Sequence, residues 1–167
     1  IFDNNDRPGI LLSSAIKKYA DYFGIACGEK NILFTNNDSA YETAISLIEK
    51  GINIEAIIDN REEINSKLIY EVEKNNIKIF KGYTIINTSG YKRINKISIM
   101  QLSKDGQKVV GSKISLSCDC LGVSGGWTPA VHLFTQSGGK LKFRDEDQVF
   151  IPNYYPSNQL SIGACNG

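Results

Sequence analysis

The chain has 167 residues, of which 19 are basic and 18 acidic, giving a formal charge of +1. Its 41% hydrophobic and 22% charged residues exclude a disordered chain and predict one buried core. The near-neutral charge excludes a polycation that binds nucleic acid through charge alone, and no apolar run approaches the ~20 residues that cross a bilayer. We therefore expect a folded domain with neither nucleic acid nor membrane as a partner.

The two ends of the sequence suggest a longer protein. The chain begins with Ile1 rather than Met, and it stops at Gly167 inside a Gly-Ala-Cys-Asn-Gly run. We therefore expect it to be a piece of a longer subunit.

The cysteines and the single histidine give little support for a metal site. Cys118 and Cys120 alternate in a run that reads as strand, so they are expected to share a face. A structural zinc site needs two more ligands at recognisable spacing, and these are missing. We expect no metal, free buried thiols and a cytoplasmic location.

The first predicted element is a helix over 8–24. The run Asp6-Arg7-Pro8-Gly9 offers a capping residue and a proline that the first helical turn tolerates. Apolar residues then recur at helical spacing from Leu12 to Phe23, and Gly24 ends the helix.

Strands and helices alternate over the next fifty residues. Short apolar runs predict buried strands, and apolar stripes at helical spacing predict the helices between them. The strands are 31–35, 54–59 and 77–80, and the helices are 39–50 and 62–75. Ser39 and Glu42 have the spacing of a capping box. This order implies parallel strands joined by right-handed crossovers.

The pattern then changes to alternation at period two, with turn signals at Ser89-Gly90 and Asp105-Gly106. It predicts an antiparallel meander of strands 84–88, 94–102 and 108–116. A buried strand at 121–124 ends at Gly125-Gly126, and short strands at 148–151 and 160–162 lie in the irregular remainder.

The predicted fold class is α/β, a Rossmann-like three-layer dinucleotide-binding fold with a central parallel sheet and an inserted three-stranded antiparallel meander. We assign residues 1–167 to a single domain of the FAD/NAD(P)-binding type. Its parts are the N-terminal helix 8–24, the βαβ core 31–124 and a return segment 125–167.

The loop after the first buried strand stands where this fold holds a dinucleotide. A Gly-x-Gly-x-x-Gly motif is expected there, but Thr35-Asn36-Asn37-Asp38-Ser39-Ala40 has no glycine, and Asp38 adds a negative charge where pyrophosphate needs to sit. Asp59 stands where a ribose-binding acid belongs, which keeps a nucleotide site open. The alternative is that Asp38 and Ser39 cap a helix, while Asp59 caps the next helix or lies in solvent.

No residue is assigned a catalytic role. His132 lies in a locally apolar run and is interpreted as a packing or interface residue, since a catalytic base needs a positioned partner. The pattern Asp119, Ser124, Gly126 and Pro129 fits a strand that ends in a tight turn, and equally a strand approached closely by a ligand.

Several runs together resemble one family. The runs Arg7-Pro8-Gly9, 34–41 and 123–133 resemble the alpha subunit of heterotetrameric sarcosine oxidase, and 136–141 and Gly163-Ala164 fit as well. The resemblance implies NAD on another domain of the subunit, and FMN and FAD in the whole complex. It implies beta, gamma and delta subunits as partners. The implied reaction is oxidative demethylation of sarcosine to glycine, with oxygen as electron acceptor and tetrahydrofolate as one-carbon acceptor.

The resemblance also implies a role for the end of the chain. Related flavoproteins end their return strand in small-x-Gly-Asp, whose Asp binds the flavin ribityl chain; here Ala164 replaces it and cannot accept that hydrogen bond. Gly163, Ala164, Cys165 and Asn166 are therefore expected to contact a cofactor through backbone N–H groups. The chain alone is expected to be an inactive scaffold without its own cofactor. Alternatives are a stand-alone nucleotide-binding or interaction module, or a subunit of a related amine or imino-acid dehydrogenase.

Overall fold

The computed structural model describes residues 2–156 and 158–167. It divides into two compact units: the first ends at Gly126, and the second runs from Trp127 to Gly167. Each unit is described by itself. The assignment of all 167 residues to one domain stays a prediction.

A five-stranded parallel sheet forms the centre of the first unit. Its strands are β1 (Ile10–Leu12), β2 (Asn31–Thr35), β3 (Ile54–Asp59), β4 (Lys78–Lys81) and β8 (Cys120–Ser124), in the order β1-β8-β2-β3-β4. All four neighbouring pairs are parallel. The chain leaves β2 towards β3 on one side and returns as β8 on the other. The strand order therefore reverses between β2 and β8, at the middle of the sheet.

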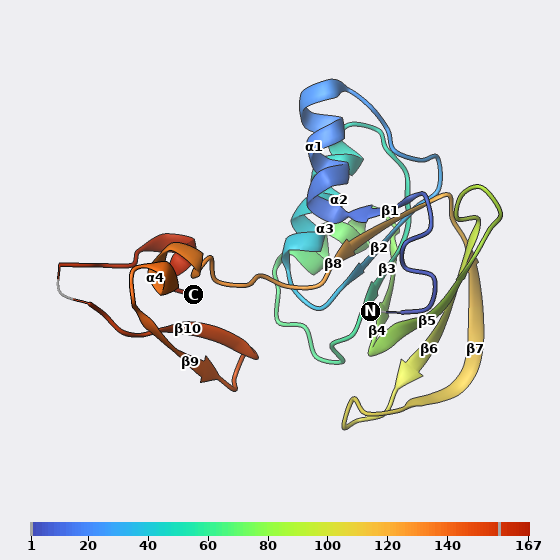
Figure 1. Cartoon of the computed structure of the whole chain (residues 1–167). Coiled ribbons are helices and arrows are strands. Elements are labelled where there is room, and N and C mark those ends of the chain that lie inside the picture. The colour runs from blue at the N-terminus through green and yellow to red at the C-terminus, as the bar shows by residue number, and fades with distance from the viewer. Residues whose placement is uncertain (1, 157) are drawn as a thin grey trace. The chain divides into compact units, whose positions relative to one another are not determined.

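Three helices cover one face of this sheet: α1 (Ser13–Phe23), α2 (Ser39–Glu49) and α3 (Leu68–Lys74) (Figure 1). Buried apolar side chains fill the space between helices and sheet, among them Ile16, Leu33, Leu47, Ile57 and Val72. Gly122 on β8 lets α1 pack closely against the sheet. A Cβ at this position would lie 2.9 Å from Ile16 Cδ1 of α1 and 2.6 Å from Leu33 Cδ2 of β2.

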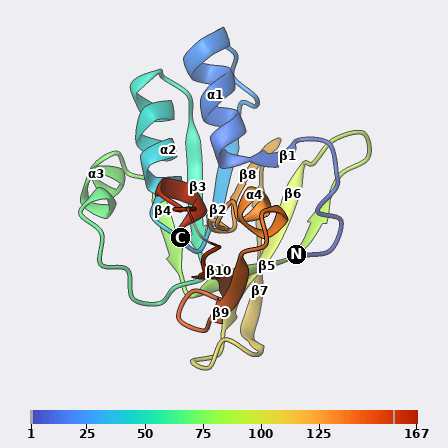
Figure 2. The same cartoon turned by 60° about the vertical axis from the view of Figure 1, so that its left-hand side comes forward.

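The predicted meander lies on the opposite face (Figures 1 and 2). Its antiparallel strands are β5 (Tyr83–Ser89), β6 (Lys96–Leu102) and β7 (Val109–Ser117). A second apolar cluster joins it to the sheet, with Ile32, Ile58, Ile85, Ile97 and Ile99 among its members. Neighbouring residues of one strand, such as Ile57 and Ile58, enter different clusters because strand side chains alternate between faces. The three-layer α/β fold is therefore confirmed.

Two predicted helices are shorter than expected. The first begins at Ser13, because Ile10–Leu12 instead pairs with β8 as strand β1. The helix predicted over 62–75 begins at Leu68, where the Ser66 hydroxyl accepts the Leu68 N–H at 3.4 Å.

The shared face predicted for Cys118 and Cys120 is wrong. Cys118 belongs to the cluster under the meander, whereas Cys120 belongs to the cluster under the helices. The alternation fails because β7 ends at Ser117 and β8 begins at Cys120, with a corner between them. The described part of the chain contains no group of three or more His, Cys, Asp or Glu side chains arranged to hold a metal ion.

The second unit contains α4 (His132–Gln136), the antiparallel strands β9 (Lys140–Arg144) and β10 (Val149–Tyr154), and a short 3₁₀ turn at Gly163–Cys165. The strand predicted at 148–151 corresponds to β10, but residues 160–162 form no strand, which corrects that prediction. Its buried hydrophobic side chains among the described residues are Phe134 and Ile151.

Candidate functional site

The carboxyl ends of β2, β3 and β8 come together at the point where the strand order reverses. In open α/β sheets this is where ligands bind. A cavity of about 250 Å³ lies there, with Phe2, Phe34, Thr35, Asn36, Asn60 and Ser124 in its lining. No charged side chain lines it. The loop between β2 and α2, which lacks the expected glycines, forms one side of this region.

Asn37 fastens this loop to β8. Its side-chain oxygen accepts hydrogen bonds from the Ser39 N–H (3.1 Å), the Ser39 hydroxyl (2.5 Å) and the Ser124 hydroxyl (3.2 Å). Its amide nitrogen donates to the Ser124 carbonyl at 3.1 Å and to the Asn36 side chain at 2.9 Å. Thr35 bonds both backbone groups of Asn37 through its hydroxyl. Every polar group of Asn37 is therefore used within the loop and β8.

Three N–H groups at the start of α2 are already bonded within the protein. Asn37 occupies the Ser39 N–H, and the Asp38 carbonyl accepts from the N–H groups of Tyr41 (3.0 Å) and Glu42 (3.4 Å). The expected capping roles of Asp38 and Ser39 are wrong. Asp38 is the N-cap residue but makes no side-chain capping bond, and the Ser39 hydroxyl bonds Asn37 instead of closing a capping box with Glu42.

The negative charge of Asp38 is matched within the protein. Arg61 Nη1 lies 2.8 Å from Asp38 Oδ1, an ion pair without hydrogen-bond geometry. The same guanidinium donates to Asp59 through Nε (3.1 Å) and Nη2 (2.8 Å). Arg61 therefore links the start of α2 to the end of β3.

Asp59 is fully buried, which corrects the expectation that it caps a helix or lies in solvent. Besides the Arg61 guanidinium, it accepts the Arg61 N–H at 2.9 Å and the Tyr41 hydroxyl at 3.0 Å. Burial, and then the adjacent Asp59 carboxylate, raise the pKa of Tyr41 well above its ordinary value, so Tyr41 stays a donor. Hydrogen bonding to Asp59 raises the pKa of Arg61 in turn. A ribose hydroxyl has no free position on this carboxylate.

The residues present do not fit a bound dinucleotide. Pyrophosphate binding needs glycines that let the backbone approach and N–H groups that face the ligand. Here an amide side chain and an Asp–Arg ion pair occupy those positions. Sequence reasoning found the missing glycines and the charge of Asp38 but missed Asn37, Tyr41 and Arg61. Only the pairing of Arg61 with Asp59 could have been suspected from the sequence, because the two residues are two positions apart.

The predicted cofactor contacts lie together in the second unit. Gly163–Cys165 forms the 3₁₀ turn; the Ala164 carbonyl accepts the Ala130 N–H at 2.9 Å, and Asn166 accepts the Tyr155 hydroxyl at 3.0 Å. The backbone N–H of Asn166 already bonds the Gly163 carbonyl. The cofactor role of Gly163, Ala164, Cys165 and Asn166 stays a prediction.

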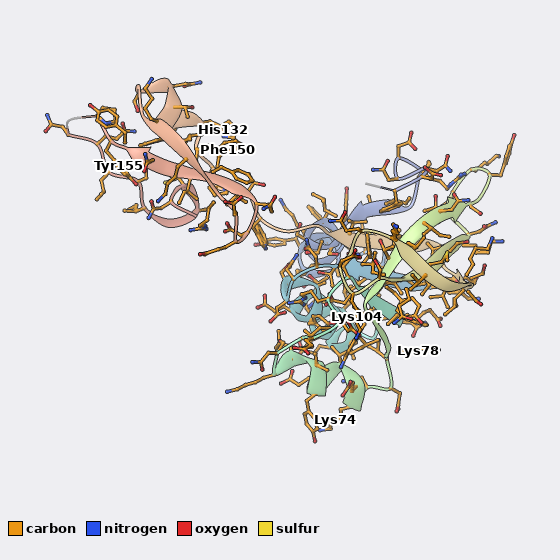
Figure 3. The ribbon with its side chains drawn as sticks, turned by 90° about the horizontal axis from the view of Figure 1, so that it is seen from below. Lys74, Lys78, Lys104, His132, Phe150 and Tyr155 are labelled. Atoms are coloured by element: carbon orange, nitrogen blue, oxygen red, sulfur yellow. The ribbon has the colours of Figure 1, made fainter. Side chains whose placement is uncertain are left out.

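The remaining candidates have mainly structural surroundings. The Asp119 carboxylate accepts the backbone N–H groups of Glu29 (3.1 Å) and Lys30 (2.9 Å), and Ser124 belongs to the Asn37 network. His132 begins α4 in the second unit and is exposed, so it does not pack into that unit (Figure 3). An interface role for His132 stays a prediction. No helix in the described residues is long and apolar enough to cross a membrane.

Comparison with known proteins gives similarity along the whole chain. No model of a protein family matches. The chain is 32% identical to the sarcosine oxidase subunit alpha of Corynebacterium sp. (strain U-96) over 167 residues, which are 100% of the chain and 17% of that relative. The chain thus spans about a sixth of the relative's length.

Solved structures match the fold at lower identity. T. acidophilum thioredoxin reductase matches with a TM-score of 0.66 at 15% identity, over 99% of this chain and 56% of that one. L-proline dehydrogenase from P. horikoshii matches with a TM-score of 0.58 at 19% identity, over 91% and 23%. The chain is therefore similar over its full length to a segment of the sarcosine oxidase alpha subunit, and its fold is that of the Rossmann-like FAD/NAD(P)-binding oxidoreductases.

Proposed function

We propose that this chain is a scaffold domain of a sarcosine-oxidase-type alpha subunit and binds no nucleotide of its own. The observation that carries the proposal is the Asn37 side chain, which accepts from the Ser39 N–H and the Ser39 hydroxyl at the start of α2, in a loop without glycine. The burial of Asp59 against Arg61 and Tyr41 supports it, because this carboxylate cannot serve a ribose. Full-length similarity to sarcosine oxidase alpha supports the placement in that subunit.

The proposed enzyme is a heterotetramer in which this subunit joins beta, gamma and delta partners in the cytoplasm. It oxidises the methyl group of sarcosine to give glycine, with oxygen as acceptor and tetrahydrofolate taking the one-carbon unit. NAD, FMN and FAD lie elsewhere in the complex, with residues Gly163–Asn166 as this chain's contribution to a cofactor contact. The relative's printed name, sarcosine oxidase subunit alpha, supports the oxidation of sarcosine and the presence of further subunits.

Calorimetric titration of the 167-residue chain with NAD, NADP and FAD tests the scaffold role. We expect no binding with a dissociation constant below about 1 mM, because the loop lacks the glycines that let the backbone approach a pyrophosphate and the Asn37 side chain already holds the Ser39 N–H. Micromolar binding of any of the three contradicts the proposal.

A separate assay tests the enzyme assignment. The whole subunit is co-expressed with its partners and assayed for oxidation of sarcosine, dimethylglycine and proline. Oxidation of sarcosine in preference to the other two is expected. Preference for proline places the chain in a related imino-acid dehydrogenase, whatever the titration of the chain shows.

A further inference from the structure

Charge is distributed unevenly between the meander and the rest of the chain. Residues 83–117, which form the meander with its turns, carry six basic and one acidic side chain. The remaining residues carry 13 basic and 17 acidic side chains. The near-neutral total therefore hides a basic layer on one face of the central sheet, on a chain that is otherwise acidic.

The exposed lysines at and after the turn of the β6–β7 hairpin form no ion pair among the described residues. These lysines are Lys104, Lys108 and Lys113. The acidic side chain in this hairpin, Asp105, accepts from the Ser103 hydroxyl and from the Gln107 N–H. It is used to shape the turn that carries Lys104, labelled in Figure 3.

The same hairpin presents apolar side chains and an open strand edge. Val109 and Val110 are each 42% exposed at the start of β7. Sheet order β5-β6-β7 leaves β7 at an edge, paired with β6 alone within the described residues. Figures 1 and 2 both show the tip of this hairpin reaching beyond the ends of the parallel strands. The register of β7 with β6 shifts at residues 111–113, so the regular parts of this edge are Val109–Val110 and 114–117, and these are a template for the addition of another strand.

We propose that the β6–β7 hairpin is a docking surface for an extended acidic segment of another protein subunit. We define the hairpin patch as Lys104, Lys108, Val109, Val110 and Lys113. The partner's backbone pairs with the free edge of β7. Because Val109 and Val110 face opposite sides of the sheet, the partner's aliphatic side chains cover one of them, and its carboxylates on the other side meet the lysines. Charge complementarity selects an acidic occupant, because a basic or neutral strand leaves the lysines unmatched.

Fluorescence anisotropy with defined peptides tests this docking surface on the 167-residue chain. The probe is a labelled peptide of alternating Glu and Val, and the control probe alternates Lys and Val. We expect the acidic peptide to bind and the basic one not to. Raising salt from 50 to 300 mM should weaken binding by about 5-fold or more, because screening reduces exposed charge interactions. Amide hydrogen exchange should slow in residues 109–113 on binding.

Two matched triple variants distinguish the contribution of the hairpin patch to peptide binding from that of exposed lysines elsewhere. The patch variant carries Lys104→Gln, Lys108→Gln and Lys113→Gln, and the control carries Lys18→Gln, Lys67→Gln and Lys74→Gln, three exposed lysines on or beside helices. The patch variant should bind the acidic peptide about 10-fold more weakly, and the control within about 2-fold of the parent chain.

Four results overturn the proposal. They are failure of the acidic peptide to bind, equal loss in the two triple variants, and tighter binding of a single-stranded oligonucleotide than of the acidic peptide. The fourth is a dimer in light scattering that only the patch variant abolishes, which makes a second copy of the chain the occupant. None of these results depends on whether the β2–α2 loop binds a nucleotide.

Discussion

Asn37 is the residue on which the structure of the β2–α2 loop depends most. It accepts three hydrogen bonds and donates two through its side chain, and two of these five reach the end of β8 at Ser124. Replacement by Ala leaves the Ser39 N–H and the Ser124 hydroxyl without this partner, at a cost of ~1–3 kcal/mol for each polar group that becomes buried and unsatisfied. We predict that Asn37→Ala lowers the free energy of unfolding by about 2–3 kcal/mol, measured by urea denaturation.

The neighbouring Asn36 provides a matched control for this substitution. It is the same residue type but is exposed; its amide donates to the Gly125 carbonyl at 3.2 Å, and its side-chain oxygen accepts one bond from Asn37 at 2.9 Å. Asn36→Ala should cost less than about 1 kcal/mol, since water replaces the lost partner. Equal destabilisation by both substitutions is incompatible with the role given to Asn37.

Among the elements, α1 and α2 are joined by the Asp21 carboxylate. Asp21 on α1 pairs with Lys17 on its own helix and with Lys50, just after α2, at 2.8 Å, and it accepts the Ser46 hydroxyl at 3.2 Å. Hydrogen bonds from Lys17 and then Lys50 lower the pKa of Asp21 from 3.8 to about 2. A carboxyl whose pKa is lower in the folded state stabilises the fold above its unfolded pKa, and this contribution disappears as pH falls through the folded value.

The lowered pKa of Asp21 determines how the effect of Asp21→Asn depends on pH. At pH 7 the substitution should lower the urea midpoint, and the difference from the parent chain should shrink as pH falls from about 4 to about 2. Glu49→Gln on the exposed side of α2 serves as control and should show no such convergence. A midpoint difference for Asp21→Asn that stays constant down to pH 2 contradicts the assignment. High salt should also reduce the difference, because the pair is partly exposed.

Local pattern predicted most elements, and non-local pairing explains the errors. The meander was readable because period-two alternation and Asp-Gly turns are short-range signals. Strand β1 was not, because its three residues share the apolar spacing of the following helix and become strand only by pairing with β8, more than a hundred residues later. The features of the site also divide into local ones, which the sequence shows, and long-range contacts, which it does not. The missing glycines are visible in the sequence, but the bond from Asn37 to Ser124 spans 87 positions.

At the scale of the whole molecule, stability is concentrated before Gly126. Both apolar clusters consist entirely of residues up to Val123, whereas Phe134 and Ile151 are the buried hydrophobic side chains described in the second unit. A unit of about 40 residues with so small a core is rarely stable alone. We predict that a chain of residues 1–126 folds by itself, with an unfolding temperature within about 5 °C of the parent chain, measured by circular dichroism.

A second truncation tests whether this stability requires the complete five-stranded parallel sheet. A chain ending at Ser117 loses β8, the strand that joins β1 to β2, and exposes both apolar clusters where Cys118, Cys120 and Leu121 had been. Removal of a central strand leaves two unpaired edges and uncovers apolar surface on both faces, so this shorter chain should show no cooperative thermal transition. Residues 127–167 alone should give the spectrum of an unfolded peptide. Cooperative unfolding of the chain ending at Ser117, or loss of folding in residues 1–126, refutes the view that the first unit is complete at Gly126. Loss of folding in residues 1–126 would mean that residues 127–167 supply part of the folding free energy, whereas cooperative unfolding of the chain ending at Ser117 would mean that β8 is not required.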